Sequence, residues 1–409
     1  MKNFKHILAV VLASAVALAS LAQQDDVNKE NRYRRLSLCN ILVKHDNEKF
    51  ADEIEQQFLK IPVSEQYNDH NLSVRVVNVN EKIKGDDEIT TFVRRNDMGS
   101  RLVGKWFNRN MLTGKCDMEL VKARGLYDAS AFDHELAARS PRGKAMLEDA
   151  GEDLIGNTYL LMHEITYIDK AKRSAMWGAI GGALMGGLMA YAGGSSQDVS
   201  NMMKNTSDII SSYKGFSVKI TSRLYRLVWD DDISGEFYTQ YYAAADDDQK
   251  RNAFEDNRDK FKVEYIGNVV SKGGRTSFLG INEEEPELMI RKACQRALDE
   301  NVADLQKKYE QFRIKAPVTS VDPTITAQIG LKEGVTPNSK YEVLEVQDDN
   351  GKIKYKRIAV IKPVASKIWD NRFMAVEEGA VGADLGATTF IKSSGGDIYP
   401  GCLIREIND

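Results

Sequence analysis

The sequence is poor in the residues and motifs that enzymes commonly use for chemistry. It has five histidines among 409 residues, and neither His134-Glu135 nor His163-Glu164 is followed by the second histidine of an HExxH zinc motif. A GxSxG nucleophile elbow, a P-loop and a GxGxxG turn after a strand are also absent. We therefore predict a protein that is not an enzyme and that uses no cofactor or metal. A hydrolase with an unrecognised site is the weakest alternative.

Cysteine is scarce, and its spacing excludes the common cysteine-based sites. The four cysteines, Cys39, Cys116, Cys294 and Cys402, are far apart, and none belongs to a CxxC or metal-type motif. Such spacing argues against redox catalysis and favours buried thiols or one structural disulfide. The sequence leaves these two alternatives open.

The chain also lacks an excess of basic residues. Lysine and arginine number 56 against 60 aspartates and glutamates, which gives a formal net charge of -4. A nucleic-acid partner is not expected, because it would require a basic patch or stripe. Hydrophobic residues make up 42% of the chain, enough for a core, and the length is typical of two or three domains.

The first 22 residues have the pattern of a secretory signal peptide. Lys2 and Lys5 form a positive start, Ile7–Leu18 is apolar, and Ser20 and Ala22 place small residues before a cleavage site. The apolar run is short for a retained membrane anchor, and no cysteine follows it as a lipoprotein signal requires. We therefore predict export to the periplasm or the outer membrane.

Residues 174–197 form an uncharged segment, rich in glycine and alanine, that nothing else in the chain resembles. On a helix, positions four apart form a ridge. One such ridge consists only of small residues: Gly178, Gly182, Gly186, Ala190 and Gly194. Large apolar side chains occupy the opposite face: Met176, Ile180, Leu184 and Leu188. A ridge of this kind lets two helices approach closely in lipid, and as a helix the segment would be about 30 Å long, the thickness of the hydrocarbon core.

This segment needs a partner to cover it. Its seven glycines would cost about 7 kcal/mol relative to alanine in an isolated helix. A bilayer, a second copy of the chain, or the predicted helix 198–213 folding back would each offset that cost. The alternatives are thus membrane insertion or membrane-coupled oligomerisation, an internal helical hairpin in a soluble protein, or a loop.

The patterning predicts two domains after the signal peptide. Residues 23–314 are expected to form an α/β-type sandwich domain, with the glycine-zipper hairpin inserted at about 171–214. Residues 315–324 are expected to be a linker, since two prolines interrupt both periodicities. Residues 325–409 are β-rich and predict a small barrel or sandwich. The fold class is therefore α+β with a C-terminal all-β domain.

Within the first domain, alternating or short apolar runs predict strands at 35–43, 72–79, 116–126, 156–169 and 261–271, and a β-hairpin over 216–244. Helical spacing predicts helices after residue 46, at 90–109, on both sides of Pro141, and from Asn282 to about Phe312. In the second domain, Asn350-Gly351 predicts a tight hairpin turn.

Three stretches in order resemble a family of bacterial envelope domains: "CDMELVKARGLYD" (116–128), "AMLEDAGEDLIGNTYLLMHEITYID" (145–169) and "GFSVKITSRLYRLVWDDDISGEF" (215–237). They are similar to the periplasmic α/β domain of curli-secretion channel subunits and of the TolB N-terminal domain. "LKEGVTPNSKYEVLEV" (331–346) resembles the start of the C-terminal module of flagellar assembly protein T. The channel subunits are lipoproteins that span the membrane with amphipathic β-hairpins. This chain has neither feature, so the resemblance implies the fold rather than a channel.

Together these features predict a non-enzymatic exported envelope protein that acts in assembly, transport or structural support through self-association at a membrane. Other envelope proteins are further candidate partners. The alternative is a soluble periplasmic or surface module that binds protein or glycan, with the zipper as an internal packed hairpin.

Overall fold

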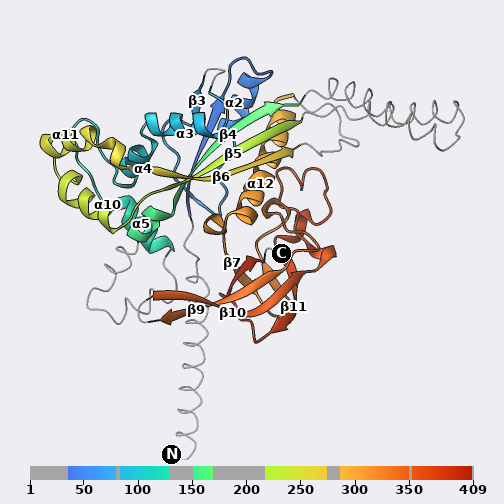
Figure 1. The fold of residues 1–409 in the computed structure, drawn as a ribbon. Coiled ribbons are helices and arrows are strands. Elements are labelled where there is room, and N and C mark those ends of the chain that lie inside the picture. The colour runs from blue at the N-terminus through green and yellow to red at the C-terminus, as the bar shows by residue number, and fades with distance from the viewer. Residues whose placement is uncertain are drawn as a thin grey trace, which may run out of the picture.

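The computed structural model describes residues 36–79, 83–128, 151–168, 217–273, 286–349 and 352–407. These residues form two units in chain order, a sheet with helices on both faces and a C-terminal β-barrel (Figure 1). The fold is thus α+β with a C-terminal all-β domain, as the sequence predicts at this level. The predicted signal peptide, residues 1–22, lies outside the described residues, as does the glycine-rich segment.

The first unit is built on a six-stranded mixed sheet with the order β2-β1-β4-β5-β6, in which β3 also pairs with β1. Its strands are β1 (Ser37–Lys44), β2 (Asn68–Asp69), β3 (Val76–Asn78), β4 (Thr158–Tyr167), β5 (Val218–Leu227) and β6 (Val263–Gly273). β1 runs parallel to β2, β3 and β4, whereas β4, β5 and β6 are antiparallel neighbours.

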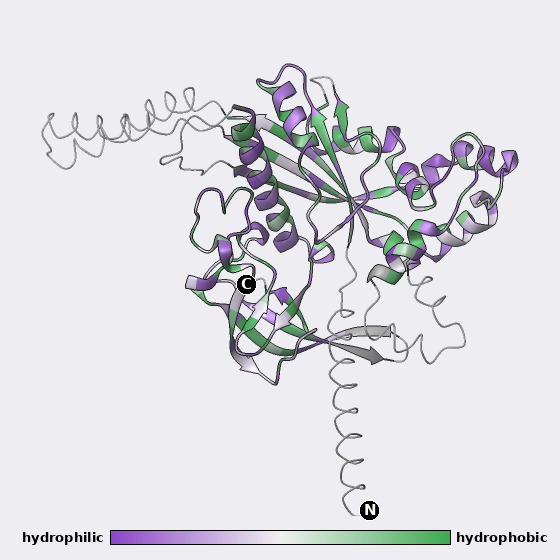
Figure 2. Ribbon diagram, turned by 180° about the vertical axis from the view of Figure 1, so that it is seen from behind, coloured by the Kyte–Doolittle hydropathy of each residue, from purple (hydrophilic) through white to green (hydrophobic). Residues whose placement is uncertain are grey.

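Helices cover both faces of this sheet. The α-helices in the described residues are α2 (Ala51–Leu59), α3 (Asp86–Arg95), α4 (Met98–Trp106), α5 (Glu119–Asp128), α10 (Asp231–Glu236), α11 (Asp248–Asp256) and α12 (Pro286–Lys308). α2 and α12 pack on one face, while α3, α4 and α5 pack on the other. Figure 2 shows apolar residues along the strands and polar residues on the outer sides of the helices.

The central strands are buried on both sides. In β4, Leu160 and Met162 join the core under α3 and α4, whereas Tyr159 and Leu161 join the core on the α12 side. Alternate side chains of a strand point to opposite faces, so a strand covered on both sides needs apolar residues at consecutive positions. This is why the apolar run of β4 is a strong strand signal.

The second unit is a closed six-stranded barrel with the order β10-β11-β8-β7-β12-β9. Its strands are β7 (Ala316–Ser320), β8 (Ile325–Ala327), β9 (Tyr341–Asp349), β10 (Lys352–Pro363), β11 (Thr388–Gly395) and β12 (Leu403–Glu406). β9 and β10 form an antiparallel pair, so the predicted hairpin around Asn350-Gly351 is confirmed by its two arms. Closure leaves the barrel without an unpaired edge strand.

Helix α12 carries the contacts that dock the barrel on the first unit. Arg296 donates from Nε and Nη2 to the carbonyl oxygen of Phe373, at 2.9 and 2.6 Å. Glu378 forms ion pairs with both Arg296 and the buried Lys292. Lower on the helix, Lys307 Nζ donates to the carbonyl oxygen of Gly334 at 3.1 Å. The two units therefore meet along one side of α12.

Several sequence predictions in the first unit were wrong. Residues 116–126, predicted as a strand, belong largely to helix α5. Asp117 Oδ1 accepts from the Glu119 backbone N–H at 3.1 Å, and Val121 and Arg124 are buried at helical spacing. The single helix predicted over 90–109 is instead α3 and α4, separated where Asp97 adopts a left-handed backbone with φ of 51°.

The hairpin predicted over 216–244 was also wrong. Only its first arm is a strand, β5, and the second arm is α10 followed by a π-helical turn, Phe237–Tyr241. Asp230 caps α10 by accepting from the Ile233 backbone N–H at 2.9 Å. Phe237 and Tyr241, four residues apart, both turn into an aromatic cluster. Since β5 already pairs with β4 and β6, the sheet has no place for the second arm.

The predicted linker, 315–324, is mostly structured. Ala316–Ser320 forms strand β7, which pairs with β8 and β12 and helps to close the barrel. Ala316 and Val318 point into the barrel core, so the alternation of apolar residues outweighs Pro317, which is exposed between them. The barrel therefore begins at Ala316 rather than at residue 325.

Candidate functional sites

The glycine-rich segment leaves the sheet and returns to it at one point. Tyr167 in β4 pairs with Val218 in β5, and the Ile168 backbone N–H donates to the carbonyl oxygen of Ser217 at 2.8 Å. Residues 169–216 thus connect the ends of two neighbouring antiparallel strands (Figure 1). The predicted membrane or self-association residues all lie outside the described residues: Gly178, Gly182, Gly186, Ala190 and Gly194.

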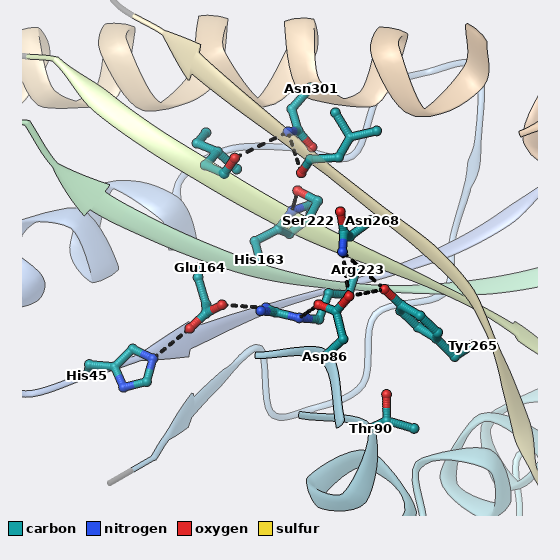
Figure 3. Close-up of polar contacts among 12 residues, drawn as sticks. His45, Asp86, Thr90, His163, Glu164, Ser222, Arg223, Tyr265, Asn268 and Asn301 are labelled. Atoms are coloured by element: carbon teal, nitrogen blue, oxygen red, sulfur yellow. Dashed lines mark hydrogen bonds and ion pairs between the residues drawn. The ribbon is translucent and has the colours of Figure 1, made fainter. Parts of the chain in front are cut away.

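A partly buried network of charged groups lies on the sheet near this attachment point (Figure 3). Arg223 of β5 forms ion pairs with Glu164 of β4 and, through Nε at 2.7 Å, with Asp86 at the start of α3. His45 Nε2 lies 2.8 Å from the other oxygen of Glu164. Tyr265 donates its hydroxyl to Asp86 at 2.5 Å. The network therefore ties the two strands that carry the insertion to α3 and β6.

A β-bulge in β6 completes the network. The register between β5 and β6 shifts after Leu224, so that Tyr265 and Asn268 lie on the same face and both donate to Asp86. Gly267 occupies the bulge with φ of 154°, and a Cβ there would lie 2.1 Å from the Tyr309 hydroxyl oxygen. A residue without a side chain is required at this position.

The electrostatics of Asp86 favour a permanent carboxylate. Burial alone raises its pKa, but hydrogen bonds from Tyr265, Arg223 and Asn268 together bring the pKa below its ordinary value. A carboxylate that receives three donors has little capacity left for a ligand. We interpret this network as a structural clamp.

Burial keeps His163 and His70 neutral by lowering their pKa values. His163 Nδ1 lies 2.6 Å from Ser222 Oγ and its Nε2 lies 3.1 Å from Asn40 Oδ1, and burial lowers its pKa to about 3. His70 lies 3.0 Å from the Leu102 carbonyl oxygen, and burial, followed by the nearby Arg124 charge, lowers its pKa well below the ordinary value. Both rings are held by protein groups, which matches the structural role predicted for His163. His134 lies outside the described residues.

The cysteines are buried and free. All four thiols are buried and none is paired, so the structure has buried thiols rather than a disulfide. Burial raises the pKa of Cys39 to about 11 and that of Cys294 to about 12. Thiols with such pKa values stay protonated at neutral pH and are poor nucleophiles.

The described part of the chain lacks two further kinds of feature. It contains no group of three or more histidine, cysteine, aspartate or glutamate residues placed to hold a metal ion. Nor does it contain a helix with both the length and the apolarity needed to cross a bilayer.

A cavity of about 60 Å³ lies between the first unit and the barrel, against α12. Apolar side chains form much of its wall: Leu38, Phe58, Ile61, Leu298 and Val302. Arg75, Asp299 and Lys332 add charged groups to it. A second cavity of about 40 Å³ shares Ala303 and Gln306 with the first, so the two follow one another along the same helix.

Sequence reasoning found neither the clamp nor the cavity. Glu164 and Arg223 gave a usable signal, because two charged residues within buried apolar strands are expected to pair. The sequence carries no comparable signal for the cavity, because its walls come from β1, α12 and the barrel, which meet only in the folded chain.

No protein-family model matches the sequence, and a search of curated proteins finds no significant match.

Proposed function

We propose that this chain is a non-enzymatic exported envelope protein that acts in assembly, transport or structural support through self-association at a membrane. The observation that carries the proposal is the attachment of residues 169–216 to two paired strand ends. A segment inserted in this way begins and ends at a single point of the sheet, and the strands on either side of it remain paired. Its small-residue ridge is then available to another copy of the chain or to a bilayer.

The surroundings of the attachment point support this role. The clamp of Glu164, Arg223 and Asp86 fixes β4 and β5 to their neighbours close to the insertion. Lys49 and Phe50 pack against Tyr167, the last residue of β4. The ring centroids of Phe50 and Tyr167 lie 4.8 Å apart. A rigid base of this kind allows force or contact at the inserted segment to be passed to the whole domain.

The proposal includes a domain assignment. We assign the first unit to the periplasmic α/β type found in curli-secretion channel subunits and the TolB N-terminal domain, with a glycine-zipper insertion. What supports it is the order of elements, a mixed sheet covered by helices on both faces and followed by a C-terminal barrel. The mature chain would then reside in the periplasm or at the outer membrane.

Substitutions on the small-residue ridge test the self-association. Gly182→Leu and Gly186→Leu place large side chains where two helices would meet, so we expect smaller assemblies in a sizing run in mild detergent. Gly235→Leu is the control, because a Cβ at Gly235 in α10 would meet no atom within 4 Å. Unchanged assembly size in both ridge variants would refute self-association through this segment.

The second candidate function is a soluble module that binds protein or glycan, with the glycine-rich segment packed internally. The observation that favours it is the pair of cavities along α12, which contain charged side chains from both units. In this case the ridge variants would unfold rather than dissociate. A thermal melt of each variant separates the two outcomes.

A further inference from the structure

The barrel and the sheet unit have separate apolar cores. The barrel core is built from residues of 316–404, whereas the cores on the α12 side of the sheet contain residues up to Ile314, and the described cores share no residue. Helix α12 lies between the sheet and the barrel (Figure 1) and contacts the barrel through polar groups. Two units that meet through polar contacts can move apart while each keeps its own core.

The polar contacts lie at two levels of α12. Arg296 binds the barrel near the middle of the helix, and Lys307 binds it at the end. Residues 313–315 then connect the end of the sheet unit to β7, the first strand of the barrel. This short connection lies at one end of the interface, so the barrel can rotate about it once the polar contacts open. Asp299 lies on the helix between the two contacts.

Two carboxyl groups meet between these contacts from opposite sides of the interface. Asp299 of α12 and Glu333 of the barrel both line the cavity of about 60 Å³. Glu333 accepts from the Gly330 backbone N–H at 2.7 Å and from Asn371 at 2.6 Å, so the barrel itself stabilises its charge. Asp299 Oδ2 is enclosed and receives no hydrogen bond from the described residues. Docking therefore places Asp299 where its ionisation is costly.

The charged groups closest to Asp299 offset only part of this cost. Burial has the largest effect and raises the pKa of Asp299 to about 7, although Lys332 of the barrel and Arg296 of α12 lower it. The charge of Glu333 raises it further. Burial also raises the pKa of Glu333, but the hydrogen bonds that this carboxyl group accepts lower it. Asp299 is thus the group most affected by docking.

The titratable groups on the sheet side of the cavity leave Asp299 Oδ2 without a donor. Arg75 uses Nη1 and Nη2 to bind two backbone carbonyl oxygens, each at 3.1 Å. His163 is neutral, because burial lowers its pKa to about 3. The Tyr67 hydroxyl accepts a hydrogen bond from Gln306. These groups are engaged within the sheet unit.

We propose that the barrel is docked on α12 while Asp299 is protonated and rotates away from it, about residues 313–315, when Asp299 ionises. Rotation would remove Lys332 and Glu333 from the cavity wall and let water hydrate the Asp299 carboxylate. The proton is released to water, so the step needs no other reactant. The docked chain binds the proton more tightly than the open chain, so the ratio of open to docked chains rises with pH up to about 7. This device is independent of the glycine-rich segment.

Spin labels on the two units test the proposal in the mature chain, residues 23–409. Leu112 of the sheet unit and Val381 of the barrel are 81% and 94% exposed, so Leu112→Cys and Val381→Cys can be labelled while the native thiols stay buried. Dilution with unlabelled chain removes distances between copies. Between pH 5 and pH 8 we expect a second inter-label distance to grow, with at least about a tenfold rise in the ratio of open to docked chains. Equal distance distributions at both pH values would overturn the proposal.

A matched pair of variants assigns the opening to Asp299. Asp299→Asn cannot ionise, so most of the rise should be lost. Asp304→Asn is the control and should open like the wild type, because Asp304 lies on the same helix and accepts from Ser271 at 3.0 Å within the sheet unit. Opening of the Asp299→Asn protein to the wild-type extent would refute the role of this residue.

A second label pair separates opening from unfolding. Leu59→Cys and Leu112→Cys place both labels at exposed positions of the sheet unit. Their distance should be the same at pH 5 and pH 8, because rotation of the barrel leaves this unit folded. A change in this distance together with the first would show unfolding instead of rotation and would also overturn the proposal.

Discussion

Asp86 and Asp299 are two carboxyl groups in different surroundings, since Asp86 is partly buried and fully hydrogen-bonded, whereas Asp299 has a buried Oδ2 without a hydrogen-bond partner. Hydrogen bonds lower the pKa of Asp86 despite its burial, whereas burial raises the pKa of Asp299 to about 7. The nearby charges of Lys332 and Arg296 lower the pKa of Asp299, and that of Glu333 raises it. A titratable group that borders a cavity and lacks hydrogen-bond partners is a functional candidate, whereas a group with all its hydrogen bonds made within the protein is a structural element.

The raised pKa of Asp299 predicts a pH-dependent stability. The pKa of Asp299 is near 3.8 in the unfolded chain and about 7 in the folded chain, so the folded chain binds this proton more tightly. The proton therefore stabilises the fold fully below pH 3.8, and this stabilisation is lost as the pH rises from 3.8 to about 7. Asp299→Asn removes this loss. We expect the variant to be more stable than the wild type by about 2 kcal/mol at pH 8 and nearly equal to it at pH 4, in urea unfolding at each pH. An equal difference at both values would contradict the raised pKa.

At the scale of elements, the doubly buried strand β4 and the amphipathic helices α2 and α12 could be predicted from the sequence, whereas α5 could not. β4 is a long apolar run that only a covered sheet accommodates. α5 was predicted as a strand because Cys116, Met118 and Leu120 fit an alternating pattern, whereas in the structure Val121 packs under the sheet as part of a helix. Nothing local in the sequence shows that β6 bulges at Gly267 or that α12 borders a cavity.

The bulge in β6 predicts that replacing glycine by alanine destabilises the fold at Gly267 but not at Gly235. Gly267→Ala places a Cβ 2.1 Å from the Tyr309 hydroxyl oxygen at a φ of 154°, so we expect a loss of about 1–3 kcal/mol in the free energy of unfolding. Gly235→Ala is the matched control in α10. It has open space and should change stability by less than about 1 kcal/mol, in the stabilising direction. A neutral Gly267→Ala would show that the Tyr309 contact is not tight.

For the whole molecule, the central question is whether residues 169–216 belong to the core. The strand ends that they connect are already paired at Tyr167 and Val218. Replacing 169–216 with an Asn-Gly turn should therefore give a folded protein with a melting temperature within a few degrees of the wild type, because this turn suits a two-residue hairpin. The same variant should lose self-association. A protein that fails to fold would place the segment in the core and favour the soluble alternative.

The most direct test of the proposed function is fractionation of the native mature protein, with an alkaline carbonate wash followed by a sizing run in mild detergent. We predict that it stays in the membrane pellet and runs as an assembly much larger than one chain. A protein that washes off and runs as a single chain would contradict self-association at a membrane.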